Sequence, residues 1–350
     1  MSVCIATAPD PDTFVRTEEF IRREIRVNRL GNGLSDAKES PNTSVGNSMS
    51  IQRIPKKGAL PVILQHGLLD TTASWVINSR KTSLGFILAD AGYDVWLVNG
   101  RGNSYSGEPN GWDWTFDDQA LDLSYIISHV NTVTNTTPIV VAHSQGATTS
   151  LLALSSNAPP SIRGLIALGP VTYLHHQTSP LFSIMAKLRI DVTLSILPSF
   201  AFGPTQILLN SALGTLCKVT PSVCDVTLSG LFGKTENLND SRMGVYTAHW
   251  PDVTSSHNMA HWIRNARSGD FSYYGGESVD ISRIHTKVAV FVGTRDSLGD
   301  PRDAARLVQT VKGATVTTVE GYAHMDFVWA ENAAELVYPQ VLEKLEEFSI

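Results

Sequence analysis

Short apolar runs alternate with amphipathic segments along the first part of the chain. Residues 60–65, 138–141 and 165–170 are apolar without polar alternation, as strands buried on both faces of a sheet are. Residues 83–91 and 116–130 instead repeat their apolar positions at helical spacing. This alternation predicts an α/β fold, with a mostly parallel sheet covered by helices on both faces.

The alternation stops midway along the chain and resumes near the C-terminus. Two further strands are predicted there, at residues 287–293 and 315–320. We therefore predict one core in two parts, residues 51–170 and 281–350. The inserted segment, residues 171–280, is predicted to cover the core, and we call it the cap.

A serine lies where one apolar run ends and a helical segment begins. Ser144 has small residues two positions before and after it, Ala142 and Gly146, as a tight strand-to-helix turn requires. The pattern predicts a nucleophile elbow, in which Ala142 stands where the usual motif has glycine. The alternative is an ordinary serine at a helix N-terminus. His143 is interpreted as a packed residue, because the turn directs it away from the serine hydroxyl.

A nucleophilic serine needs a base and a group that orients the base, in the chain order Ser, Asp or Glu, His. Asp296 directly follows a predicted buried strand and is the candidate acid, with Asp300 and Asp303 as alternatives. Asp300 is more typical of a helix N-cap, because a proline follows it. His324 follows the last predicted strand and is the candidate base.

Acyl transfer also needs N–H donors aimed at the oxyanion that forms on the attacked carbonyl group. The backbone N–H of Gln145, directly after the serine, is the first candidate. The loop after the strand at 60–65 supplies the second, because Gly67 lets the backbone turn and the Leu68 N–H is predicted to face the site. A His-Gly pair after a strand is a weak motif alone, but four parts in the right order are specific.

Motifs spread over most of residues 51–350 are shared with a known family. They lie at residues 64–69, 86–97, 101–103, 117–123, 142–146, 241–246, 261–262 and 322–330. These segments resemble the acid lipases, the group of gastric lipase and lysosomal acid lipase. The resemblance implies an α/β-hydrolase fold with a cap and a lipase or lipid-ester hydrolase. It implies the same site as the strand order does: catalytic Ser144, Asp296 and His324, with oxyanion donors at Leu68 and Gln145.

Composition narrows the function further. The net charge is −6 and no cluster of Lys and Arg forms a phosphate-binding stripe, so we expect no nucleic acid partner. The sequence has no glycine-rich phosphate loop and no Cys/His group with zinc spacing, so we predict no cofactor and no metal ion. No transmembrane segment is predicted, because the apolar run of the cap is interrupted by Arg189, Asp191, Pro198 and Pro204.

We therefore expect a lipase that hydrolyses carboxylic esters of lipids, triacylglycerols or steryl esters, at a lipid–water interface. The apolar residues at 181–202 form either the cap's own core or a funnel and docking face for lipid, and both can hold for different residues. The alternatives are an esterase, thioesterase or acyltransferase for small soluble substrates, and a catalytically inactive lipid-binding protein on the same fold. Dehalogenases and epoxide hydrolases are disfavoured, because they carry Asp in place of Ser144.

Two of the three cysteines lie close together in the cap. Cys217 and Cys224 form either a local disulfide or two buried free thiols, whereas Cys4 stands alone. The acid lipases have a cap disulfide near this place, so the resemblance favours the bond. A disulfide in turn indicates an oxidising compartment.

Residues 1–50 are predicted to hold an N-terminal helix and a disordered segment. Residues 29–50 are polar, rich in Gly, Ser and Asn, and without helix or strand period. The acid lipases have a first strand here, so we expect either an incomplete or mis-spliced gene product or a variant with a trimmed sheet edge. No signal peptide is read, although the resemblance implies a secreted or lysosomal protein. N-glycosylation triplets begin at Asn42, Asn135 and Asn239.

Overall fold

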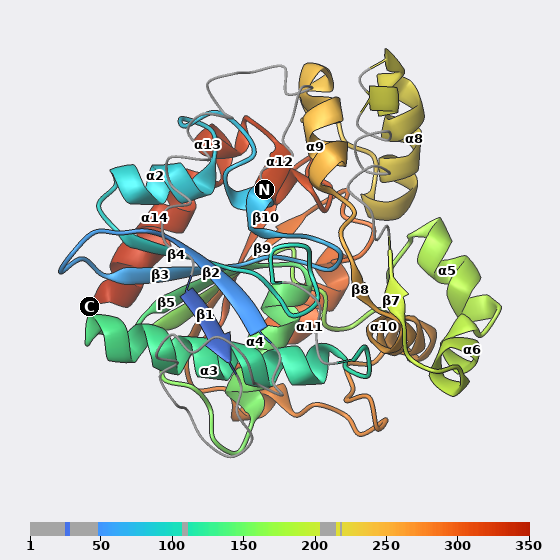
Figure 1. Ribbon diagram of the computed structural model, residues 1–350, viewed down its shortest axis with the longest axis horizontal. Coiled ribbons are helices and arrows are strands. Elements are labelled where there is room, and N and C mark those ends of the chain that lie inside the picture. Colours follow the sequence, from blue (N-terminus) through green and yellow to red (C-terminus); the bar gives the residue numbers. More distant parts are fainter. Residues whose placement is uncertain (1–24, 29–47, 107–110, 204–214, 218) are drawn as a thin grey trace.

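The computed structural model describes residues 25–28, 48–106, 111–203, 215–217 and 219–350 (Figure 1). They contain an eight-stranded sheet with the order β1-β2-β4-β3-β5-β6-β9-β10. β2 pairs antiparallel with β1 and β4, and the other pairs are parallel, as predicted. The strands are β1 (Ile25–Asn28), β2 (Ser48–Ile54), β3 (Pro61–Gln65), β4 (Asp94–Val98), β5 (Ile139–His143), β6 (Gly164–Leu168), β9 (Lys287–Gly293) and β10 (Thr315–Val319).

Both faces of the central strands are buried, which explains their apolar runs. Val62 and Leu64 of β3 pack in one apolar cluster, whereas Ile63 between them packs in the other, because successive side chains point to opposite faces. Helices α3, α4 and α11 cover one face, and α2 and α14 cover the other. Their bounds are α2 (Leu84–Asp90), α3 (Phe116–Thr134), α4 (Gln145–Ser155), α11 (Pro301–Thr310) and α14 (Tyr338–Ser349).

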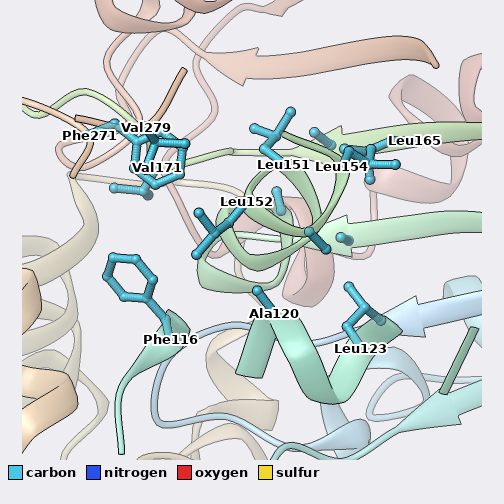
Figure 2. Packing of buried hydrophobic residues seen from close by; sticks show 14 of the residues in the cluster. Phe116, Ala120, Leu123, Leu151, Leu152, Leu154, Leu165, Val171, Phe271 and Val279 are labelled. Carbon is cyan, nitrogen blue, oxygen red and sulfur yellow. The ribbon is translucent and has the colours of Figure 1, made fainter. Parts of the chain in front are cut away.

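Helix α3 illustrates how local signals and packing combine. Thr115 begins the helix in a capping box with Asp118, which satisfies backbone N–H groups that have no acceptor within the helix. Figure 2 shows Ala120 on the face of α3 that packs toward Leu152 of α4. The helix extends beyond the predicted end at residue 130, and Asn135 terminates it in the left-handed conformation, with φ 49°.

The chain between β6 and β9 forms the elements of the cap. Figure 1 shows α5, α6 and α8 on one side of the sheet, away from α2 and α14. The assignment of residues 171–280 as a separate unit stays a prediction. The elements are α5 (Pro180–Lys187), α6 (Ile190–Ile196), β7 (Ala201–Phe202), α8 (Pro221–Phe232), η2 (Asp240–Arg242), α9 (Met243–His249), β8 (Thr254–Ser255) and α10 (Ser256–Ser268).

The prediction for the N-terminal edge of the sheet is wrong where the structure describes it. Residues 48–50 begin β2, although the sequence predicted disorder over residues 29–50, and Ile25–Asn28 forms β1 at an edge for which a trimmed variant was one of two expectations. These short segments are strands because each pairs with a neighbour in the sheet, a contact that their own polarity does not reveal. The predicted N-terminal helix, Cys4, Asn42 and residues 29–47 lie outside the described residues. Among the residues inside them, no helix is both long and apolar enough to cross a bilayer.

Candidate active site

Ser144 occupies the sharp turn between β5 and α4. Its backbone has φ 53° and ψ −123°, a conformation that non-glycine residues rarely adopt and that marks a strained turn. A Cβ added to Gly146 would lie 2.6 Å from the carbonyl oxygens of Gln65 and His66. The glycine is therefore required by the close approach of α4 to the end of β3, which agrees with the predicted elbow.

Three candidate residues from three loops meet at one edge of the sheet. His324 Nε2 lies 2.7 Å from Ser144 Oγ, and His324 Nδ1 lies 2.8 Å from Asp296 Oδ2. All three side chains are buried. Asp296 is held in place by the N–H groups of Leu298 and Gly299, which both donate to Oδ1 at 2.8 Å. With Nδ1–H donating to Asp296, Nε2 is free to accept the serine proton.

The two alternative carboxylates, Asp300 and Asp303, form hydrogen bonds elsewhere. Asp300 caps α11, because its Oδ1 accepts from the Arg302 N–H at 2.8 Å. Asp303 accepts from the His176 N–H at 2.9 Å and contacts the His176 ring. Of the three carboxylates, Asp296 is the one whose oxygen lies at hydrogen-bond distance from His324.

The two candidate oxyanion donors flank the serine. Gln145 is the first residue of α4, so its N–H belongs to the group that has no acceptor within the helix. Leu68 lies in the loop after β3, where a Cβ added to the preceding Gly67 would lie 3.0 Å from Ser144 Cβ. The loop backbone therefore runs directly past Ser144. The oxyanion roles themselves stay predictions.

A buried histidine holds this loop. His66 Nδ1–H donates to the Gly67 carbonyl at 2.8 Å, and Nε2 accepts from the Gly100 N–H at 2.9 Å. Burial lowers the pKa of His66 to about 4, so the ring is neutral and can donate from Nδ1 and accept at Nε2. Leu69, further along, has φ 55°, and its carbonyl accepts from the Asp252 N–H at 2.7 Å. The sequence predicts none of these contacts.

His143 supports the base rather than acting on the serine. Its Nε2–H donates to the His324 carbonyl at 3.0 Å, and the two ring centroids lie 4.9 Å apart. Burial lowers the pKa of His143 to about 3, so the ring is neutral. This agrees with the interpretation of a packed residue.

The end of α8 contacts two loops with candidate residues, the acid loop that carries Asp296 and the base loop that carries His324. The Phe232 carbonyl accepts from the Ser297 N–H at 3.3 Å and from the His324 N–H at 3.1 Å. Gly233 follows with φ 98°, and a Cβ there would overlap the Arg295 carbonyl oxygen. Backbone contacts of this kind leave no side-chain signature, so sequence reasoning missed them.

An apolar cavity of about 240 Å³ opens at Ser144 between the core and the cap. Apart from Asp70 and the catalytic candidates, its wall is built almost entirely of apolar side chains. Leu181, which lines it, is also 44% exposed, so the cavity lining continues to the surface. The apolar lining comprises Leu68, Leu69, Val171, Leu174, Leu181, Phe182, Met185, Phe202, Leu231, Phe232, Trp250, Pro251, Met259, Trp262, Leu298 and Met325.

The predicted cap disulfide is present. Cys217 and Cys224 are bonded, with their Cα atoms 5.6 Å apart, and both are buried. Cys224 lies in α8, the same helix whose other end contacts the acid and base loops. The disulfide therefore holds the N-terminal part of α8, whose C-terminal end contacts the loops that carry Asp296 and His324.

Comparison with known proteins agrees with this fold. Residues 61–331 match the α/β-hydrolase fold family. The chain therefore belongs to the α/β-hydrolase fold family. It is 33% identical to gastric triacylglycerol lipase of Rattus norvegicus, with 87% of each chain covered. It is 30% identical to Lipase lipl-1 of Caenorhabditis elegans, with 86% of each chain covered.

The fold is also similar to that of a solved structure, a soluble variant of monoglyceride lipase from Saccharomyces cerevisiae in complex with a substrate analog. The TM-score is 0.60 at 14% identity, covering 98% of this chain and 99% of the other. The predicted fold class and the resemblance to the acid lipases are thus confirmed. The relatives also bear out the prediction of a carboxylic ester hydrolase of the lipase class.

Proposed function

We propose that the protein is a lipase that hydrolyses carboxylic esters of lipids through an acyl-enzyme. The observation that carries the proposal is the hydrogen-bonded chain from Asp296 through His324 to Ser144, which opens into an apolar cavity. A reactive polar centre at the wall of an apolar cavity suits an ester whose acyl part is a hydrocarbon chain. The name of the rat relative, a triacylglycerol lipase, supports triacylglycerol as the substrate class.

Acylation follows from the hydrogen-bond geometry. Ser144 Oγ attacks the ester carbonyl carbon while its proton moves to Nε2 of His324. Asp296 holds the Nδ1–H tautomer and stabilises the imidazolium that forms. The backbone N–H groups of Leu68 and Gln145 donate to the oxyanion. When the tetrahedral intermediate collapses, the bond to the alcohol oxygen breaks, and Nε2–H protonates the departing alcohol.

Deacylation repeats the same proton transfers with water. His324 Nε2 takes one proton from water as its oxygen attacks the acyl carbon, and the same two N–H groups stabilise the second oxyanion. Collapse breaks the bond to Ser144 Oγ, which recovers the proton from His324. The products are a carboxylic acid and the unmodified enzyme.

The partner we propose is a lipid–water interface. Residues 181–200 of the cap carry exposed apolar side chains, among them Ile184 at 54%, Leu188 at 67% and Ile196 at 77% exposure. Leu181 belongs both to this surface and to the cavity wall, so a lipid on the surface lies next to the route to Ser144. Exposed apolar side chains gathered on one segment next to a binding cavity are typical of a docking site for an apolar partner.

We also propose a secreted or lysosomal location. The disulfide between Cys217 and Cys224 supports it, because such bonds persist in oxidising compartments. Asn135 is exposed just after α3, and Asn239 is half-buried before η2, so Asn135 is the better glycosylation candidate of the two. Peptide mapping of protein from its native source tests both the bond and the glycans.

Labelling with a fluorophosphonate tests the nucleophile. We expect the label on Ser144, and we expect Ser144→Ala to lose both the label and hydrolysis of emulsified tributyrin while its circular dichroism stays unchanged. Near wild-type hydrolysis by this variant would place the nucleophile elsewhere. Hydrolysis of dissolved short esters without emulsified ones would indicate an esterase, and neither label nor hydrolysis would indicate an inactive lipid-binding protein.

A further inference from the structure

The side chain of Gln145 is held from two directions. Its Oε1 accepts from Asn258 Nδ2 at 2.9 Å and from Trp262 Nε1, and its Nε2 donates to Gln119 Oε1 at 2.6 Å. Gln145, Asn258 and Trp262 are all buried. The residue that carries a candidate oxyanion N–H is therefore fixed by its side chain between α3 of the core and α10 of the cap.

The two donors on α10 are themselves well placed. Asn258 and Trp262 are four residues apart, so they lie on one face of the helix. Asn258 Nδ2 also contacts Thr254 Oγ1 at 3.0 Å, and the Trp262 ring lies 5.0 Å from the Phe116 ring of α3. Each of the two side chains is thus also held by a contact that does not involve Gln145.

The same face of α10 reaches the apolar cavity at Ser144. Trp262 contributes to the cavity wall and also donates to Gln145, so one side chain touches both regions. Oxyanion stabilisation depends steeply on the placement of its donors, which must lie about 2.7–3.1 Å from the developing charge. A small displacement of Gln145 would therefore reduce turnover without removing any group that touches the substrate ester.

We propose that Asn258 and Trp262 are positioning residues that fix Gln145, and with it the oxyanion N–H, and so tie the cavity-lining helix α10 to the catalytic centre. The proposal rests on the proposed function. Loss of the Asn258 donor leaves Gln145 Oε1 with one donor fewer in a buried place, which favours a shifted side chain and backbone. Transition-state stabilisation is lost, whereas ground-state binding of the ester is retained.

The test compares two asparagines of the same helix. Asn258→Leu removes the donor to Gln145, and Asn265→Leu is the matched control, because Asn265 is equally buried but bonds to Ser272 instead. We expect Asn258→Leu to lower kcat on p-nitrophenyl butyrate about tenfold with KM nearly unchanged. The Ki of butylboronic acid, which mimics the tetrahedral state, rises by the same factor. Asn265→Leu lowers the melting temperature but leaves kcat and Ki unchanged.

Two further variants keep the test decisive. Trp262→Phe removes the other donor while keeping an aromatic side chain in the cavity wall, and it lowers kcat and raises the Ki of butylboronic acid if Asn258→Leu fails to fold. In a Gln145→Leu background, Asn258→Leu has no additional effect on kcat. Equal kcat values for wild type and both folded donor variants, or kcat losses that add fully in the double variant, overturn the inference. If Ser144→Ala also stays active, the proposed function fails as well.

Discussion

Two carboxylates near the end of β9 can be distinguished by single substitutions. Asp296→Asn places an amide opposite His324 Nδ1 and favours the tautomer with its proton on Nε2, so Ser144 loses its base. We expect kcat on p-nitrophenyl butyrate to fall about 10⁴-fold with the fold intact. Asp300→Asn is the control, because asparagine also caps helices well and α11 keeps its start. A larger loss at Asp300 would reverse the assignment.

Asp70 makes a pH-dependent contribution to stability. Its Oδ1 accepts from the Thr71 N–H and from Ser74 Oγ, but its buried Oδ2 finds no partner among the described residues. Burial, with a smaller effect of the nearby Asp252 carboxylate, raises the pKa of Asp70 from 3.8 to about 7. The folded protein thus keeps a proton that the unfolded chain releases above pH 4.

The free energy of unfolding therefore falls as the pH rises from about 4 to about 7, by up to about 4 kcal/mol from this group alone. Asp70→Asn removes the titration while keeping the shape of the side chain. We expect urea unfolding to show the variant gaining stability relative to wild type between pH 5 and pH 8. Parallel stability curves for the two proteins would show that Asp70 is ionised in the folded state.

At the scale of elements, helix α8 provides a matched pair of glycines. Gly233, directly after the helix, has φ 98°, and an added Cβ would overlap the Arg295 carbonyl oxygen of the acid loop. Gly233→Ala should displace the end of α8 and with it the Phe232 carbonyl that holds the Ser297 and His324 N–H groups. We expect both kcat and the melting temperature to fall.

Gly230, one turn earlier, gives the opposite expectation. A Cβ there meets no atom within 4 Å, so Gly230→Ala should stabilise the helix by about 1 kcal/mol and leave kcat unchanged. Thermal melts and kinetics of both variants check the pair. Similar kcat values for the two would mean that the contact of α8 with the acid and base loops has no influence on catalysis.

At the scale of the whole molecule, we expect the exposed apolar side chains of the cap to affect hydrolysis only when the ester is at a lipid–water interface. Ile184→Glu combined with Leu188→Glu places charge on the cap surface without changing the cavity wall. Hydrolysis of emulsified tributyrin should fall at least about tenfold, because burial of the apolar side chains in lipid is lost. Hydrolysis of dissolved p-nitrophenyl butyrate should stay unchanged.

Leu336→Glu is the control for this surface. Leu336 is 50% exposed on α13 (Ala333–Leu336), which lies far from α5 in Figure 1. Adding a charge there should change neither activity. If all variants hydrolyse the emulsion equally well, the cap surface does not dock on lipid.

The sequence by itself determined the parts of the site that lie next to strands. Ser144 was found because small residues surround it between an apolar run and a helical segment, and Asp296 and His324 because each follows a strand. Parallel strands bring their carboxyl ends to one edge of the sheet, so chain order alone predicts that such residues meet. The proximity of Cys217 and Cys224 in a cysteine-poor chain suggested a local disulfide, and the family resemblance favoured it over two free thiols.

Only the tertiary structure decided which distant groups support these residues. No local sequence pattern predicts the contacts of the Phe232 carbonyl or the donation from Asn258 and Trp262 to Gln145. The same holds for the pairing that makes Ile25–Asn28 a strand. Periodicity and turn chemistry report on the conformation of neighbouring residues. Contacts between residues far apart in the sequence depend on how the cap packs on the core. That packing is determined by the whole chain and not by any local segment.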